Sequence, residues 1–370
     1  MSPEVGPREP ASPWAHSFFS QGLLGAPAYG LDETKTKIKL DQNEMPWDFP
    51  APLKGKILER VSQREWNRYP SPFTPELNQA LSHYLGVPAA NIFTGPGSNY
   101  LITLLFEALG HQLKGVMWVA RPSFALFESQ CRYTGLRYEP WLLDQDLNYN
   151  LDALSTLPPG SLVVFASPNN PTGSVISMAQ LDGLLAAHPL SLFIADEAYF
   201  EFGSDNYLSL LAKYGNLILI RTLSKTMGAA GVRLGYVVAA ERFIEQLVKL
   251  RLPYLLNHFT VEATMAIFED RDLLSYCQQN VRLLVSERDR LHRALAPIAA
   301  RQGFEVRNTS ANFLFLRWTQ PEAAHEFYTR LLARGILVRD ISKGPGLAGC
   351  LRISVGTQDE NDALIGAAAQ

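Results

Sequence analysis

The stretch LVVFASPNNPTG, residues 162–173, places a short apolar run directly before a polar turn. The same arrangement recurs downstream as LFIADEAY at 192–199 and LILIRTLSK at 217–225. Uninterrupted apolar runs of this length, rich in β-branched and aromatic residues, are typical of strands buried on both faces of a sheet. We therefore predict strands at 162–166, 192–195 and 217–220, each ending at a group of polar residues.

Similar runs lie further out at 116–119 (VMWV) and 235–239 (GYVVA), and helical patterns lie between the runs, for example at 98–109 and 178–187. Strands that alternate with helices indicate an α/β domain with a mostly parallel sheet. The sequence therefore predicts a large α/β domain in the middle of the chain.

The pattern changes after about Pro253. A long helical stretch at about 260–298 is followed by apolar runs at 304–306, 313–317, 336–340 and 351–355, with a helix near 321–334. This order predicts a smaller α+β domain. Residues 1 to about 40 are rich in Pro, Gly and polar residues and predict an extended arm with at most one short helix. We expect an arm at 1–45, a large domain at 46–255 and a small domain at 256–370.

Composition narrows the class of protein. Of the 370 residues, 47% are hydrophobic and 19% are charged, which is typical of a globular chain. A formal net charge of −3 gives no basic field that would favour nucleic acid or an anionic membrane. No apolar run approaches the roughly 18 residues of a membrane span, and the N-terminus lacks the pattern of a signal peptide. We expect a cytoplasmic protein that binds neither nucleic acid nor a membrane.

The three cysteines, Cys131, Cys277 and Cys350, stand singly, without the paired spacing of a zinc site. We expect free thiols, a reducing compartment and no bound metal.

Polar or aromatic residues follow four of the predicted strands. In an open α/β sheet, ligands bind beyond the carboxyl ends of the strands, so these residues should meet in one crevice. Each piece alone has an ordinary explanation, since Asp-Glu can cap a helix, Ser-Lys can be a surface pair and Asn-Pro-Thr-Gly can be only a turn. Their combination, in this order and spacing, is specific.

The combination resembles the fold-type I aminotransferases that depend on pyridoxal 5′-phosphate (PLP). The family's motifs stand here as NPTG (170–173), DEAY (196–199), SK (224–225) and GVRLGY (231–236). The resemblance extends from about Leu40 to Thr357 and implies the PLP-dependent transferase fold type I. It also implies PLP as cofactor.

Roles for the crevice residues follow from the resemblance. Lys225 would hold the cofactor as a Schiff base and then move the α-proton of the substrate, a task that suits an amine of depressed pKa. Asp196 would pair with the pyridinium nitrogen and keep it protonated. Tyr199 and Asn170 would bind the 3′ oxygen of the ring, and Phe124 would stack on its face.

The cofactor phosphate needs a separate site. GPGS at 95–98 precedes a predicted helix, where glycines allow close approach and free backbone N–H groups bind an anion. An ordinary Gly-Pro turn is the alternative. In this family the loop carries the phosphate, which implies a site made from Gly97, Ser98, Asn99, Ser224 and Arg233.

Finer motifs look like the histidinol-phosphate aminotransferases: KLDQNEMP (39–46), RYP (68–70), SPNNPTG (167–173), ILVRD (336–340) and GCLRISVGT (349–357). Met45 stands where relatives usually have Asn. This branch implies transfer of the amino group of L-histidinol phosphate to 2-oxoglutarate by a homodimer. An aromatic aminotransferase and a threonine-phosphate decarboxylase remain alternatives. A non-enzymatic regulator on the same fold is disfavoured by the intact Asp196 and Lys225 pair.

The resemblance also implies contacts at the substrate side. Tyr69 would reach the cofactor phosphate of the neighbouring subunit, although a buried aromatic before a Pro turn is its alternative. Arg352 would hold the anionic group of the substrate. Arg339 would add a second positive donor, unless it is a surface residue paired with Asp340. Further substrate contacts are expected from Tyr29, Asn43 and Asn170.

Overall fold

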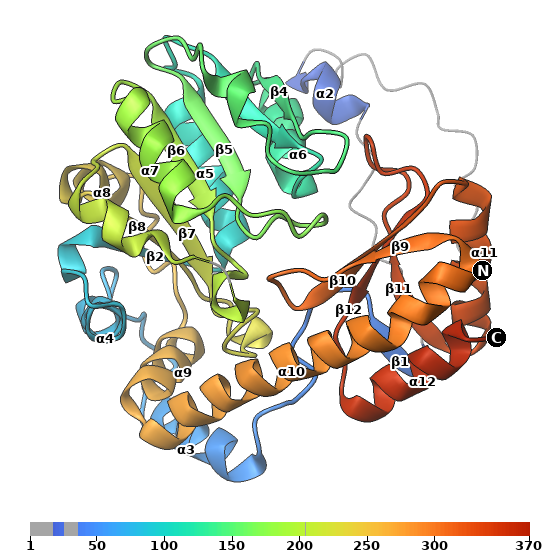
Figure 1. The fold of residues 1–370 in the computed structure, drawn as a ribbon. Coiled ribbons are helices and arrows are strands. Elements are labelled where there is room, and N and C mark those ends of the chain that lie inside the picture. The colour runs from blue at the N-terminus through green and yellow to red at the C-terminus, as the bar shows by residue number, and fades with distance from the viewer. Residues whose placement is uncertain (1–17, 26–35, 204) are drawn as a thin grey trace.

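Two sheets form the framework of the protein, as the computed structural model shows (Figure 1). The structure describes residues 18–25, 36–203 and 205–370. The longest helix, α10 (Arg271–Gln302), runs along one side of the molecule beneath the smaller sheet. Within the described ranges, no helix combines the length and the apolar composition needed to cross a bilayer.

The larger sheet has seven strands and confirms the predicted α/β class. Their order is β2 (Ile92–Gly95), β8 (Gly235–Ala239), β7 (Leu217–Thr222), β6 (Leu192–Asp196), β5 (Leu162–Ala166), β3 (Met117–Arg121) and β4 (Glu139–Leu142). Neighbouring strands are parallel except where β8 pairs with β2 and β7. The sequence did not predict β2 and β4.

Both faces of this sheet are buried, as the uninterrupted apolar runs predicted. Alternate residues of one strand enter different cores, so that Val163 packs with one cluster and Val164 with the other. The first cluster includes residues of α3 (Ala51–Ser62), α4 (Pro75–Leu85), α7 (Met178–Ala187) and α9 (His258–Glu269). The second includes residues of α5 (Ser98–Gly110), α6 (Ala125–Thr134) and α8 (Glu241–Val248).

The smaller sheet has five strands in the order β1 (Ile38–Leu40), β11 (Ile336–Asp340), β12 (Cys350–Ser354), β10 (Phe313–Trp318) and β9 (Phe304–Arg307). One face packs on α10, α11 (Pro321–Ala333) and α12 (Gln358–Ala368). β1 is parallel to β11, whereas the other pairs are antiparallel. The end of the predicted arm therefore supplies a strand of this sheet, while the domain boundaries at 45 and 255 stay predictions.

The long helical stretch expected at about 260–298 is present, and it consists of two helices, α9 and α10, which meet at Asp270. The Asp270 carboxylate accepts hydrogen bonds from the backbone N–H groups of Asp272 (2.8 Å) and Leu273 (3.2 Å). The Asp270 side chain therefore caps the start of α10. This cap favours a new helix over a continuation of α9 through Asp270.

The remaining elements among the described residues are short. They are α2 (Gln21–Leu24) and the 3-10 turns η1 (Ala89–Asn91), η2 (Leu151–Leu154), η3 (Phe200–Phe202), η4 (Tyr207–Ala212) and η5 (Ala230–Val232).

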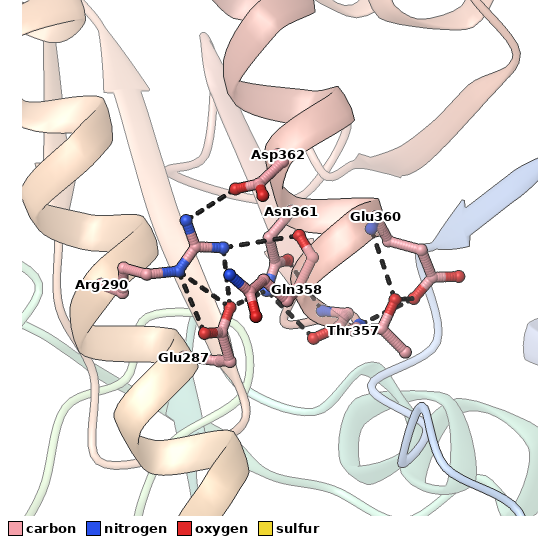
Figure 2. Close-up of polar contacts among 8 residues, drawn as sticks. Glu287, Arg290, Thr357, Gln358, Glu360, Asn361 and Asp362 are labelled. Atoms are coloured by element: carbon pink, nitrogen blue, oxygen red, sulfur yellow. Dashed lines mark hydrogen bonds and ion pairs between the residues drawn. The ribbon is translucent and has the colours of Figure 1, made fainter.

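A polar cluster fixes the segment that follows β12 (Figure 2). Arg290 of α10 pairs with Glu287 at 2.8 Å and donates to Asp362 of α12 at 2.6 Å. Asn361 of α12 donates to Glu287 at 3.1 Å and exchanges two hydrogen bonds of 3.0 Å with the backbone of Gly356. The cluster holds the chain just beyond β12 against α10, so the position of β12 is fixed at its exit.

Candidate active site

The strand ends meet at one edge of the large sheet. Asp196, the last residue of β6, lies opposite Ala166 at the end of β5 and Ile220 near the end of β7. Because β8 runs the other way, its first residue, Gly235, lies opposite Thr222 at the end of β7 and Gly95 at the end of β2. The segments that follow β5, β6 and β7 therefore begin at the same edge, as the strand pattern predicted, and the segment that follows β2 begins there too.

Asp196 is a buried carboxylate at the centre of this edge. Its Oδ1 accepts a hydrogen bond from the backbone N–H of Ala198 at 3.0 Å. Burial raises the pKa of Asp196 to about 7, and the nearby Glu197 adds to the rise. A carboxylate this poorly solvated favours a cationic partner that would stabilise its charged form.

Lys225 lies on the loop after β7, and its amine faces the N-terminal segment. Its Nζ donates to the backbone carbonyl of Gln42 at 2.8 Å. Burial, followed by the positive charge of Arg352, lowers the pKa of Lys225 to about 8. About a tenth of this amine is therefore neutral at pH 7, far more than for an ordinary lysine, and the neutral form is what a nucleophile or a base requires.

Tyr199 and Asn43 lie together beside Lys225. The Lys225 Nζ is 6.0 Å from the centre of the Tyr199 ring. Asn43 Nδ2 donates to the Tyr199 hydroxyl oxygen at 3.1 Å. Burial raises the pKa of Tyr199, so its hydroxyl keeps its proton and can act as a donor.

The loop before α5 forms a narrow cradle. A Cβ atom on Gly97 would lie 2.6 Å from Nη2 of Arg233, and one on Gly235 would lie 2.5 Å from the backbone N of Ser98. At Gly235 the neighbouring atoms belong to the backbone, so only glycine fits, and at Gly97 the φ of 88° favours glycine. Arg233 Nη1 donates to the Ser224 hydroxyl at 3.4 Å.

The N-terminal turn of α5, which contains Ser98 and Asn99, lies in this cradle, and such a helix start favours an anion.

Arg352 and Arg339 form a cationic corner on the small sheet. They are paired residues of β12 and β11, so their side chains leave the same face of the sheet. Arg352 is buried, and its Nη1 donates to Asn170 Oδ1 at 2.6 Å. Its Nη2 donates to the backbone carbonyl of Asp41. Arg352 thus connects the small sheet with the turn after β5.

The other predicted residues have varied positions. Phe124 is half-buried just before α6 and meets Phe127 edge to face at 5.8 Å. Tyr69 is 76% exposed and stacks on Tyr254 with ring centres 4.2 Å apart, so it is not the buried aromatic considered from the sequence. Tyr29 lies outside the described residues.

A buried ion pair lies behind the crevice. Nη2 of Arg221 on β7 is 2.8 Å from Oε2 of Glu197, and both side chains are almost fully buried. Glu197 also accepts from the backbone N–H of Tyr207 at 3.0 Å. Because Glu197 follows Asp196 directly, this pair joins the ends of β6 and β7 beneath the site.

Comparisons with known proteins identify the family. The model of "Aminotransferase class I and II" matches residues 35–367. The chain is similar to the histidinol-phosphate aminotransferase of Thermoanaerobacter pseudethanolicus, at 34% identity over 93% of this chain and 95% of the relative. It is also similar to that of Ruminiclostridium cellulolyticum, at 32% identity over 91% and 93% of the two chains. The chain belongs to the class I and II aminotransferase family.

A solved structure agrees on the fold of this aminotransferase. The histidinol-phosphate aminotransferase of Sinorhizobium meliloti, in complex with pyridoxal-5′-phosphate, has a TM-score of 0.81 at 24% identity. The alignment covers 95% of this chain and 97% of that structure. The predicted fold type I architecture is therefore confirmed.

PLP is the cofactor of this aminotransferase family, and the described residues fit it. The glycine-lined cradle before α5 suits a phosphate that must approach the backbone closely. The raised pKa of Asp196 suits a carboxylate that meets a protonated ring nitrogen, and the lowered pKa of Lys225 suits an amine that attacks an aldehyde.

Three site residues were not predicted from the sequence. Gln42 supplies only its backbone carbonyl to Lys225, so its side chain carries no signal. Thr222 donates to the Ser224 hydroxyl at 3.0 Å and extends the cradle. Gly235 was visible within GVRLGY, where a glycine at the first position of a strand could have indicated a close backbone approach.

Proposed function

We propose that this aminotransferase transfers the amino group of L-histidinol phosphate to 2-oxoglutarate, giving imidazole-acetol phosphate and L-glutamate. The observation that carries the proposal is the similarity to curated histidinol-phosphate aminotransferases, at 32% and 34% identity over more than nine-tenths of the chain. Histidine biosynthesis is the process that this reaction serves.

The cofactor would be held by residues at both ends of its ring. Asp196 would bind the protonated ring nitrogen, and Tyr199 and Asn170 would bind the 3′ oxygen. Phe124 would stack on the ring. When bound, PLP withdraws electrons from the substrate's α-carbon and so makes the α-proton acidic.

The phosphate of the cofactor would lie in the cradle before α5. The backbone N–H groups of Gly97, Ser98 and Asn99 would donate to it, because the start of a helix favours an anion. Ser224 and Arg233 would complete the site, with Arg233 supplying a planar fork of donors.

Lys225 would carry the proton during catalysis. Its amine would remove the α-proton of the substrate and return it at the carbon that accepts it. The amine is suited to both steps, since its pKa of about 8 lies close to neutral pH.

The cationic corner would select the substrate. Arg352 would hold the phosphate of one substrate and the carboxylate of the other, since both groups accept paired hydrogen bonds from a guanidinium. Arg339, paired with Arg352 across β11 and β12, would add a second positive charge. Asn43, Asn170 and Tyr29 would contribute further substrate contacts.

We also propose that the enzyme is a homodimer. Large aromatic side chains are exposed on one loop, with Trp66 and Tyr69 each 76% and Phe73 60% exposed. Exposed apolar residues grouped in this way are typical of an interaction surface. Tyr69 would then bind the cofactor phosphate of the partner subunit.

A cytoplasmic location is proposed on chemical grounds. All three cysteines are buried free thiols, which suits a reducing compartment.

The test is a single half-reaction. The purified holoenzyme is mixed with L-histidinol phosphate in the absence of any oxo-acid, and the visible band of the bound cofactor is followed. Rapid loss of the band, faster than with phenylalanine at equal concentration, is expected. A preference for phenylalanine or tyrosine would move the substrate to the aromatic class. Release of CO2 without consumption of 2-oxoglutarate would instead indicate a decarboxylase.

A further inference from the structure

Asn43 has an unusual backbone and a complete set of polar contacts. Its φ of 53° lies in the left-handed region, which is uncommon for residues other than glycine and is tolerated best by Asn and Asp. Its side chain is almost fully buried. A buried residue held in such a conformation by its surroundings points to a functional constraint.

The contacts of Asn43 join the two sheets. Its backbone N–H donates to the Ser354 hydroxyl oxygen at 2.8 Å, and its backbone carbonyl accepts from Asn312 Nδ2 at 2.8 Å. Its Oδ1 accepts from the Ser354 hydroxyl at 2.9 Å. Its Nδ2 donates to Tyr199 at 3.1 Å. Ser354 ends β12 of the small sheet, whereas Tyr199 follows β6 of the large sheet.

These contacts give each proton in the chain of bonds a direction. The Ser354 oxygen accepts from the Asn43 backbone N–H, and the Ser354 hydroxyl donates its own proton to Asn43 Oδ1. The amide nitrogen of Asn43 must then face Tyr199, and an amide N–H can only donate. Tyr199 therefore accepts from Asn43, and the single proton of its hydroxyl is directed elsewhere.

We propose that Asn43 is a positioning residue that directs the Tyr199 hydroxyl proton toward the 3′ oxygen of the cofactor. The proposal rests on the role of Tyr199 proposed above. The 3′ oxygen carries negative charge, so it needs a donor, and a phenol whose oxygen already accepts a hydrogen bond is a stronger donor. Asn43, which the sequence predicted to contact the substrate, would thus act on the cofactor through its hydrogen bond to Tyr199.

The decisive variant is Asn43→Asp. An Asp is nearly isosteric and tolerates the left-handed φ, but its carboxylate accepts where the amide donated. The Tyr199 proton would then turn to that carboxylate and away from the cofactor. We expect the dissociation constant of PLP to rise about tenfold, the effect of losing one hydrogen bond to a charged group. The pH midpoint of the visible band should rise by about one unit for the same reason.

Asn43→Gly is the second variant, because it keeps the left-handed backbone and removes the amide without adding charge. The Tyr199 hydroxyl is then free to rotate. The dissociation constant of PLP and the pH midpoint of the visible band should both rise, but by less than in Asn43→Asp. Ser354→Ala should act like Asn43→Gly, since the amide orientation is no longer imposed. Far-ultraviolet circular dichroism checks that each variant is folded.

A double-mutant cycle with Tyr199→Phe separates proton direction from charge. The charged groups that face Tyr199 are Asp196, Lys225 and Arg352, and all three are retained in these variants. If Asn43 acts through the Tyr199 proton, Asn43→Asp has no further effect on PLP affinity or on the pH midpoint once Tyr199 is Phe. An equal effect in both backgrounds would overturn the proposal.

The two levels of the proposal can fail separately. If Tyr199→Phe alone changes neither PLP affinity nor the pH midpoint, the cofactor role of Tyr199 is wrong. If Tyr199→Phe changes both quantities and Asn43→Asp changes neither, only the positioning role of Asn43 is wrong.

Discussion

Replacing Asp196 by Asn should stabilise the cofactor-free protein while it slows turnover of the cofactor-bound enzyme by several orders of magnitude. Burial raises the pKa of Asp196 from its ordinary value of 3.8 to about 7. Between these pH values the folded protein holds a proton on Asp196 that the unfolded chain has released. The unfolded state therefore binds fewer protons, and the free energy of unfolding falls as pH rises through this window.

The size of the effect follows from the shift. At about 1.4 kcal/mol per pKa unit, the raised pKa of Asp196 costs roughly 4.5 kcal/mol of stability above pH 7, where the buried group is ionised, and roughly 1.7 kcal/mol at pH 5, where it is protonated. An amide at this position carries no such cost. In urea unfolding of the cofactor-free proteins, the stability gained by Asp196→Asn over wild type should be roughly 3 kcal/mol larger at pH 8 than at pH 5.

The exposed Asp152 offers a matched control. Asp152→Asn should leave the free energy of unfolding within about 0.5 kcal/mol of wild type at both pH values. The reasoning fails if Asp196→Asn is less stable than wild type at pH 8, or if its change in the free energy of unfolding is the same at both pH values. Either result would mean that burial does not destabilise the ionised carboxylate. With the cofactor bound, turnover of Asp196→Asn should fall by several orders of magnitude, and near-normal turnover would refute the role of Asp196.

Three further predictions concern neighbouring residues. Lys225→Ala should lose both turnover and the visible band of protein-bound cofactor, and a persistent band would refute Lys225 as the attachment point. Arg352→Ala should raise KM for the anionic substrates by the equivalent of about 2–5 kcal/mol, and steady-state kinetics that show an unchanged KM would move the anion site elsewhere. Arg221→Met should destabilise the protein by about 3–5 kcal/mol in urea, because it leaves the Glu197 carboxylate buried without its partner. The double variant with Glu197→Leu should recover most of that loss, and no recovery would contradict the charge argument.

The sequence predicted best those parts of the fold where a local residue pattern is compatible with only one kind of secondary structure. Strands at 162–166 and 235–239 were predicted with the observed bounds, because uninterrupted apolar runs have few other uses in a chain of this composition. β4 (Glu139–Leu142) was missed, since this strand lies at the edge of the sheet and includes an exposed Glu139, Pro140 and an exposed Leu142. The break at Asp270 was missed because a capping Asp is not distinguished from a helical Asp by periodicity alone.

The crevice could be predicted because strand ends in a parallel sheet must meet. That rule was enough to place Asp196 and Lys225 in the crevice, whereas their roles came from the resemblance to the aminotransferases. Arg352 was harder, because it comes from the other sheet and reaches Asn170 only after the two sheets are placed together. Tyr69 and the dimer stay predictions, since a single subunit does not contain the partner's site.

The segment 41–45 marks the limit of sequence reasoning at this site. The carbonyl of Asp41 accepts from Arg352, the carbonyl of Gln42 accepts from Lys225, and the amide of Asn43 donates to Tyr199. Two of these three contacts use backbone atoms, which every residue carries, so no residue type indicates them. The third depends on a left-handed φ that favours Asn, Asp or Gly, and it therefore leaves a preference in the sequence. It follows that side-chain changes at Gln42 retain the acceptor for Lys225, whereas changes at Asn43 alter both the backbone and the proton that Tyr199 can offer.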